Sequence, residues 1–363
     1  MIEKNLQTEN LSTFELESKN IDFEKKEVFG SSLIIVDGIW GCGKSLLIDL
    51  LAAAKNTEAW RHDEILDTIP ILRAFGKITK ESSKYIIKQH IDQLTYNYQL
   101  SRELNFRLKD KTCVLRSRKV IDYIISLISQ APKELEVIRK ASEMTIPIMT
   151  HMSTFNNDAI YEALGARAKT LIVIRNPIYM IEHWVGYIDR CGTDPREFTP
   201  SITNGKDNVP WFAANWANEY TIINSTEKSI KSIKELYSML LNQIGRCGNK
   251  KIQIVCFDDL ILNTDHSITK IADYLQIEID VRNFAKRKRK NKVPRNSEHL
   301  EIGYASDQWR RGVKGNKPSE VDEYMKKMKN KVSSNYIEIL GECIEIYNTL
   351  KQNYCSIVTH SDK

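Results

Sequence analysis

The chain has 363 residues, a formal net charge of +6 and 42% hydrophobic residues, which is enough apolar material for a buried core. The mild positive charge suits a partner that carries phosphate or sulfate and disfavours an obligate nucleic-acid binder. The seven cysteines are scattered and form no CxxC pair, which predicts neither a disulfide framework nor a zinc site. The N-terminus is polar and lacks a secretory signal, and no apolar run reaches 18 residues. We therefore expect a cytoplasmic protein without a membrane partner.

The pattern of elements predicts one α/β domain over 30–363, preceded by a polar arm over 1–29. Short apolar runs predict strands, and stretches with helical periodicity separate them. Such alternation indicates a doubly wound parallel sheet flanked by helices. In chain order we expect a strand at 32–36, a helix at 46–54, a helical insert over about 60–110, a strand at 111–115, a helix at 123–138, strands at 145–149 and 170–174, helices at 178–188 and 211–239, a strand at 252–257, a helix at 267–275, a basic loop at 285–295 and a C-terminal helix over about 319–351.

A phosphate-binding motif lies between the first strand and the first helix. Residues 38–45, Gly-Ile-Trp-Gly-Cys-Gly-Lys-Ser, satisfy G-x-x-x-x-G-K-[ST] at every fixed position. Glycines permit backbone angles that turn successive N–H groups inward as an anion-binding nest, and the helix N-terminus adds its dipole. Lys44 supplies a positive charge for phosphate oxygens. The motif predicts phosphate binding but leaves the reaction open, because kinases, other nucleoside triphosphatases and sulfotransferases share this architecture.

Two further polar residues follow predicted strands. His151 comes just after the run Ile146-Pro147-Ile148-Met149-Thr150, and Arg175 ends the run Leu171–Ile174. The carboxyl ends of strands are where open α/β sheets place their ligands. An imidazole and a guanidinium are therefore expected beside the phosphate loop. Arg175 has an alternative role, an ion pair with Asp258 or Asp259.

The order of these motifs resembles that of the cytosolic sulfotransferases, which use 3′-phosphoadenosine 5′-phosphosulfate. The similarity runs over about 32–317 and includes the Thr-His pair, the Arg-Asn-Pro turn, a strand ending in Asp-Asp-Leu, and an Arg-Arg-Gly-x-x-Gly loop. These segments are 150–151, 175–177, 255–260 and 310–315.

The resemblance implies a role for each matching residue. His151 would be the general base, Lys44 would stabilise charge on the breaking bond, and an unknown hydroxylated acceptor would lie over His151. Cofactor-binding residues would be Gly38, Gly41, Cys42, Gly43, Lys44, Ser45, Leu46, Arg175, His183, Arg310, Arg311 and Gly312. The chain also departs from the family pattern. Gly41 stands in place of a lysine, Lys44 and Ser45 in place of threonines, Leu46 in place of an aromatic residue, Met149 in place of a lysine and His183 in place of a serine.

Two alternatives stay open. The first is an ATP-dependent small-molecule or nucleoside kinase, favoured by the intact Lys44-Ser45 pair, in which Ser45 would be a ligand of Mg²⁺. The Asp37-Gly38 and Arg116-Ser117-Arg118 segments also resemble those of nucleoside kinases, although no strand supplies an obvious second magnesium ligand. The second alternative is a non-catalytic nucleotide-binding module that has kept the loop. The basic run 286–290 is interpreted as a solvated loop, because no aromatic residues interleave it.

Overall fold

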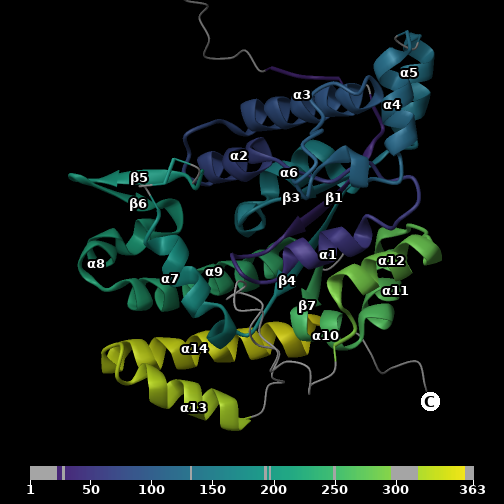
Figure 1. Ribbon diagram of the computed structural model, residues 1–363. Coiled ribbons are helices and arrows are strands. Elements are labelled where there is room, and N and C mark those ends of the chain that lie inside the picture. Colours follow the sequence, from purple (N-terminus) through teal and green to yellow (C-terminus); the bar gives the residue numbers. More distant parts are fainter. Residues whose placement is uncertain are drawn as a thin grey trace, which may run out of the picture.

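The computed structural model describes residues 23–26, 29–130, 133–191, 194–195, 198–247, 251–295 and 318–355 (Figure 1). Its centre is a five-stranded sheet of order β2-β3-β1-β4-β7, and every neighbouring pair is parallel. The strands are β1 (Ser32–Asp37), β2 (Arg61–His62), β3 (Thr145–Met149), β4 (Ala168–Ile174) and β7 (Ile252–Cys256). The predicted α/β fold with a parallel sheet is confirmed.

Helices and short turns fill the rest of the described chain. The α-helices are α1 (Lys44–Leu51), α2 (Glu64–Ala74), α3 (Lys80–Gln99), α4 (Val120–Ile128), α5 (Glu134–Ser142), α6 (Asp158–Leu164), α7 (Ile181–Ile188), α8 (Ala217–Ile222), α9 (Ser225–Cys247), α10 (Phe257–Leu262), α11 (Thr264–Leu275), α12 (Val281–Asn291), α13 (Pro318–Met328) and α14 (Ser334–Leu350). The shorter helical turns are η2 (Val114–Arg116), η3 (Ser153–Asn156), η4 (Gly165–Arg167), η5 (Pro177–Tyr179), η6 (Trp211–Trp216) and η9 (Lys351–Cys355). A separate hairpin joins β5 (Ser201–Asn204) to β6 (Asp207–Pro210).

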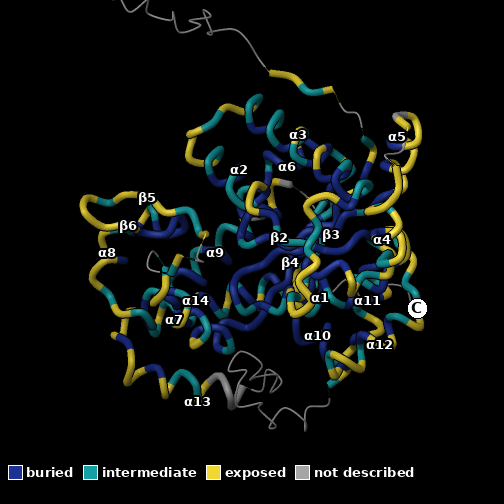
Figure 2. Tube along the Cα trace, turned by 45° about the horizontal axis from the view of Figure 1, so that its top comes forward, coloured by how far each residue is buried: buried dark blue, intermediate teal, exposed yellow. Residues whose placement is uncertain are grey.

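The sheet is buried because its strands are apolar on both faces. The side chains of Ile35, Val36, Ile172 and Val173 have no measurable exposure. Helix α1 packs against β1 and β3 with α12 beside it, whereas α6 packs against β4 and under α3. Figure 2 shows the strands as a buried centre surrounded by partly exposed helices. Such burial on both faces is what a continuous run of β-branched residues requires.

The predicted strands at 32–36, 145–149, 170–174 and 252–257 all lie in this sheet. The predicted strand at 111–115 is wrong. There the chain forms a loop and η2, because Asp110 accepts hydrogen bonds from the backbone and hydroxyl of Thr112 and turns the chain. Cys113 and Val114 are buried in that turn.

The predicted basic loop at 285–295 is also wrong over most of its length, since α12 extends to Asn291. The side chain of Asp280 caps this helix by accepting from the backbone of Asn283 at 2.8 Å. One member of the basic run, Arg287, is only 8% exposed and donates to Asp49 of α1. The run is therefore a helix docked by one of its arginines.

Several predicted helices are divided. The helix expected at 123–138 is two helices, α4 and α5, and that expected at 211–239 comprises η6, α8 and α9. The C-terminal helix is likewise two helices, α13 and α14. The helical insert contains α2 and α3, as predicted, but β2 and the β5–β6 hairpin were missed. No helix in the described ranges is both long and apolar enough to cross a bilayer.

The predicted N-terminal arm lies outside the described residues up to position 22. The short described part, 23–26, contacts α3: the ring of Phe23 lies 5.8 Å from that of Tyr85, and Lys25 forms a 2.9 Å ion pair with Asp92.

Candidate functional site: the phosphate loop and its neighbours

The phosphate loop connects β1 to α1. Gly38, Gly41 and Gly43 have φ angles of 144°, 79° and 104°. At Gly43 an added Cβ would lie 2.1 Å from the ring of Phe257, and at Gly38 it would lie 2.6 Å from the carbonyl oxygen of Val173. Both positions therefore require glycine for backbone angle and for space. The loop is closely supported by β4 and by the first residue of α10.

Lys44 begins α1 and is 6% exposed. Its Nζ donates to the carbonyl of Gly38 at 2.7 Å, which bends the side chain back across the loop. The hydroxyl of Ser45 contacts the thioether of Met149 at 3.9 Å, a weak interaction that a ligand can replace. An ammonium, a hydroxyl and the N-terminus of α1 thus converge on the space that an anion would occupy.

Asp37 fixes the loop to the turn after β3. Its side chain is fully buried, and its carboxylate accepts from the backbone N–H groups of Gly38 and Met152 and from the hydroxyl of Ser153. The last two bonds measure 2.8 and 3.0 Å. Because β1 and β3 are neighbours, this carboxylate holds the turn that contains His151 beside the loop.

His151 is paired with Asp67, which α2 contributes. The backbone N–H of His151 donates to Oδ1 of Asp67 at 2.6 Å, and its ring Nδ1 lies 3.4 Å from Oδ2. The ring of His62, the last residue of β2, stacks on that of His151 at 5.2 Å and 13°. A carboxylate that orients an imidazole is the arrangement that general bases use.

Burial controls protonation in this group. Burial, followed by the charge of Asp37, raises the pKa of Asp67 well above its ordinary value. Burial, with smaller contributions from His151 and Lys44, lowers the pKa of His62 to about 4. His62 is therefore neutral near pH 7. The charge of Lys44 also contributes to the pKa shifts of His62 and Asp67.

Arg175 and His183 contact the loop from the β4 side. The Nη1 group of Arg175 donates to the carbonyl of Gly41 at 3.0 Å, and its guanidinium lies 4.6 Å from the centre of the Phe257 ring. Arg175 is 3% exposed. The His183 ring occupies the space over Gly41, where an added Cβ would lie 2.7 Å from it. In this geometry both residues brace the loop backbone.

A cavity of about 290 Å³ is lined by the His151–Asp67 pair and, from the phosphate loop, by Trp40. Its polar wall contains His62, Glu64, Asp67, Thr68 and His151, and its aromatic wall contains Trp40, Tyr187, Phe198 and Trp211. Trp40 belongs to the phosphate loop and stacks on Tyr187 at 4.6 Å. The cavity therefore has room for an acceptor beside a phosphate.

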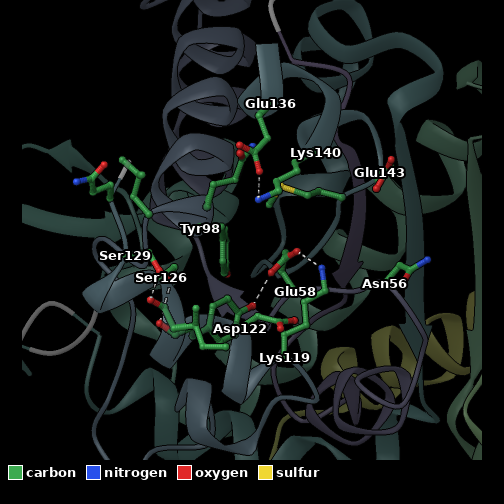
Figure 3. A pocket seen from close by; sticks show the side chains of 16 residues that line it. Asn56, Glu58, Tyr98, Lys119, Asp122, Ser126, Ser129, Glu136, Lys140 and Glu143 are labelled. Carbon is green, nitrogen blue, oxygen red and sulfur yellow. Dashed lines mark hydrogen bonds and ion pairs between the residues drawn. The ribbon is translucent and has the colours of Figure 1, made fainter. Parts of the chain in front are cut away.

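A larger cavity, of about 700 Å³, lies elsewhere (Figure 3). Met144 lines it, and this residue precedes β3 whereas His151 follows it, so the cavity is at the opposite end of the strand from the loop. On its floor Glu58 accepts from Lys119 and from the hydroxyl of Tyr123. These bonds satisfy the buried carboxylate internally.

The structure brings most of the predicted residues together. The phosphate loop and Leu46 lie together with His151, Arg175 and His183. Cys42 is fully buried, with its sulfur against Gly38, and burial raises the pKa of its thiol. The predicted segment Arg310–Gly312 lies outside the described residues. Sequence reasoning missed Asp67 and His62, because neither belongs to a motif. Two positions in the chain could have pointed to these residues: Asp67 lies in the first turn of α2, and His62 lies just before that helix.

A family model described as the KAP family P-loop domain matches residues 27–341. The chain belongs to the KAP family of P-loop domains. This membership supports the predicted P-loop and its binding of a nucleotide, and it leaves the reaction open. None of the curated proteins matches the chain significantly in sequence.

Solved structures with a similar course of the chain include sulfotransferases. The sulfotransferase domain from the curacin biosynthetic pathway is 12% identical with a TM-score of 0.44, and the comparison covers 88% of this chain and 98% of that one. The corresponding domain of the Synechococcus PCC 7002 olefin synthase is 12% identical with a TM-score of 0.43, over 90% and 96%. A mouse sulfotransferase in complex with PAP is 12% identical with a TM-score of 0.37, over 88% and 89%. Likeness at this level decides nothing about the chemistry of this chain.

Proposed function

We propose that this KAP-family domain binds a nucleoside triphosphate with Mg²⁺ at the loop 38–45 and transfers its terminal phosphoryl group to a hydroxyl acceptor or water in the adjoining cavity. The observation that carries this proposal is the cavity that the Asp67–His151 pair shares with Trp40 of the phosphate loop. His151 would accept the proton of the acceptor, and Asp67 would orient its ring.

The donor oxygens of the site fit a hard cation. A polyphosphate beside Asp37 and Asp67 would be repelled unless a cation lay between the charges. Asp37 is already committed to three hydrogen bonds and Asp67 to His151, so the exposed hydroxyl of Ser45 is the group that would hold Mg²⁺ together with phosphate oxygens and water. A bound Mg²⁺ would neutralise charge that develops on the phosphoryl group. Lys44 would do the same from within the loop.

Sulfuryl transfer from 3′-phosphoadenosine 5′-phosphosulfate is the second candidate. It is favoured by the arrangement of His151 and Arg175 on opposite sides of one phosphate loop, in the order of the sulfotransferase motifs. This chemistry requires no metal, and it would use the same base. Arg175 would have to release the carbonyl of Gly41 before it could bind the 3′-phosphate.

Thermal denaturation with a panel of nucleotides separates the two candidates. ATP or GTP with Mg²⁺ is expected to stabilise the protein by about 2.7 kcal/mol at a hundredfold excess over Kd, and chelation of the metal should remove this gain. Lys44→Ala should abolish it. Stabilisation by 3′-phosphoadenosine 5′-phosphate without metal, and none by a triphosphate, would reject phosphoryl transfer in favour of sulfuryl transfer.

His151→Ala tests whether chemistry follows binding. The variant should retain the nucleotide-dependent stabilisation, whereas turnover of the triphosphate should fall by about 10²–10⁴-fold. Unchanged turnover would remove His151 from the mechanism. Stabilisation of the wild type by nucleotide without any turnover would favour the non-catalytic binding module.

A further inference from the structure

Two thiols meet at the open edge of the central sheet. Cys256 is the last residue of β7, which pairs with β4 alone among the strands of the described residues. The free edge of β7 is covered by the terminal turn η9, which packs along it. Cys355 is the last residue of that turn. Both cysteines are free thiols in this structure.

The two thiols lie close together, because both line one cavity and β7 packs against η9. The hydroxyl of Tyr347 lies 3.7 Å from the sulfur of Cys256. A disulfide between the two cysteines would fasten the C-terminal turn to the sheet edge.

A cavity reaches the pair, and the two thiols differ: Cys256 is 2% exposed, whereas Cys355 is half-buried. A cavity of about 340 Å³ is lined by both cysteines together with His266, Lys270 and Lys351. The hydrogen bond from Cys355 lowers the pKa of the Cys256 thiol, against the effect of burial, and the same bond raises the pKa of Cys355. Cys256 is thus the thiol that more readily becomes the nucleophilic thiolate, and Cys355 is placed to react with it.

We propose that Cys256 and Cys355 form a reversible redox pair that a small hydroperoxide converts to a disulfide. The Cys256 thiolate attacks the terminal peroxide oxygen, the O–O bond breaks, and the leaving alkoxide takes a proton, giving a sulfenic acid and an alcohol, or water from hydrogen peroxide. The sulfur of Cys355 then attacks the sulfur of Cys256, forming the S–S bond and releasing the hydroxyl as water with the thiol proton. Two thiols are oxidised, and one peroxide bond is reduced.

The position of the pair connects it to the phosphate loop. The residue after Cys256 is Phe257, whose ring fills the space beside Gly43 and lies under the guanidinium of Arg175. A bond at Cys256 therefore constrains the strand end that supports the loop. This inference is independent of which group the loop transfers.

The full-length chain is treated with a small excess of hydrogen peroxide and then alkylated. We expect the intact mass before alkylation to fall by the two hydrogens lost on disulfide formation, peptide mapping to join Cys256 to Cys355, and dithiothreitol to reverse both changes. Oxidised protein should melt about 5 °C higher than reduced protein, since the bond closes a long loop.

Cys355→Ser is the decisive variant, because its position at the end of η9 leaves the core intact. It should show neither the disulfide nor the rise in melting temperature, and Cys256 should instead progress to sulfenic and sulfinic acids. Cys191→Ser, which removes another partly exposed thiol, should behave as wild type. Mapping that joins Cys256 to any other cysteine, or oxidation of Cys191 before Cys256, would overturn the proposal.

Discussion

Asp67 illustrates how a residue of the candidate site can lower the stability of the fold. Its carboxylate is held beside the buried Asp37, and its pKa is raised well above the ordinary 3.8. The folded chain therefore keeps a proton that the unfolded chain releases once the pH exceeds about 4. Folding binds protons in that range, so the contribution of Asp67 to stability falls as pH rises. A charge that destabilises the unliganded fold is expected where a cation or ligand compensates it.

Asp67→Asn tests both roles of this side chain. At pH 7.5 the unliganded variant should melt at a higher temperature than wild type, and the difference should disappear toward pH 4. Triphosphate turnover should nevertheless fall about 100-fold, because the amide does not orient His151 as a carboxylate does. Asp273→Asn, at an exposed position on α11, is the control for a general effect of charge. A variant that is less stable than wild type at pH 7.5 would contradict the assigned electrostatics.

At the scale of elements, apolar patterning predicted the sheet better than its surroundings. Leu33–Val36 and Leu171–Ile174 are continuous β-branched or apolar runs that only a doubly covered strand buries. Thr112–Leu115 has a similar composition, yet the cap formed by Asp110 turns it away from the sheet. Local hydrogen bonds and the availability of a strand partner decided this segment, and neither can be derived from apolar content.

The candidate site, like the fold, was predictable in part from the sequence. Its loop carries a motif, and His151 and Arg175 follow strands, so their approach could be inferred from parallel sheet geometry. Asp67 comes from a helix in the insert, where no spacing rule connects it to the loop. That His151 and Asp67 meet depends on how α2 packs against η3, which is a tertiary result.

Helix α4 shows that helical periodicity of apolar residues does not always identify the buried face. Ile121, Ile124, Ile125 and Ile128 repeat at helical spacing, yet they are 67%, 47%, 54% and 86% exposed. In Figure 2 this helix lies at the margin of the molecule. The opposite side carries Tyr123, whose hydroxyl donates to Glu58. The buried hydrogen-bonded tyrosine, and not the apolar stripe, orients the helix.

The stripe on α4 should therefore be nearly neutral to substitution. Ile124→Gln with Ile128→Gln is expected to change the free energy of unfolding by less than about 0.5 kcal/mol in urea titration, since exposed positions lose little. Ile87→Ala, at a fully buried position of α3, should cost about 2–5 kcal/mol in the same assay. A loss above about 1.5 kcal/mol in the α4 variant would mean that the stripe is covered in solution.

For the molecule as a whole, the histidines around the loop make folding sensitive to acid. Burial is the main cause that lowers the pKa of both His62 and His183 to about 4 from 6.5, and the charges of His151, Lys44 and Arg175 add to it. Between pH 4 and pH 6.5 these two histidines are protonated in the unfolded chain but neutral in the folded chain. Stability is therefore lost as the pH falls from about 6.5 to 4. Asp67 acts in the opposite sense, so it partly masks this loss.

The combined variant His62→Gln, His183→Gln should flatten that dependence. Each histidine contributes at most about 1.4 kcal/mol per pH unit to the slope, because each accounts for at most one proton. Urea unfolding at intervals from pH 7 to 4 measures the slope, and His266→Gln, at an exposed position, should leave it unchanged. Parallel curves for the combined variant and wild type would show that these imidazoles are hydrated in the folded chain. Because His183 lies over Gly41 and His62 stacks on His151, this outcome would also mean an open loop rather than the enclosed phosphate site described above.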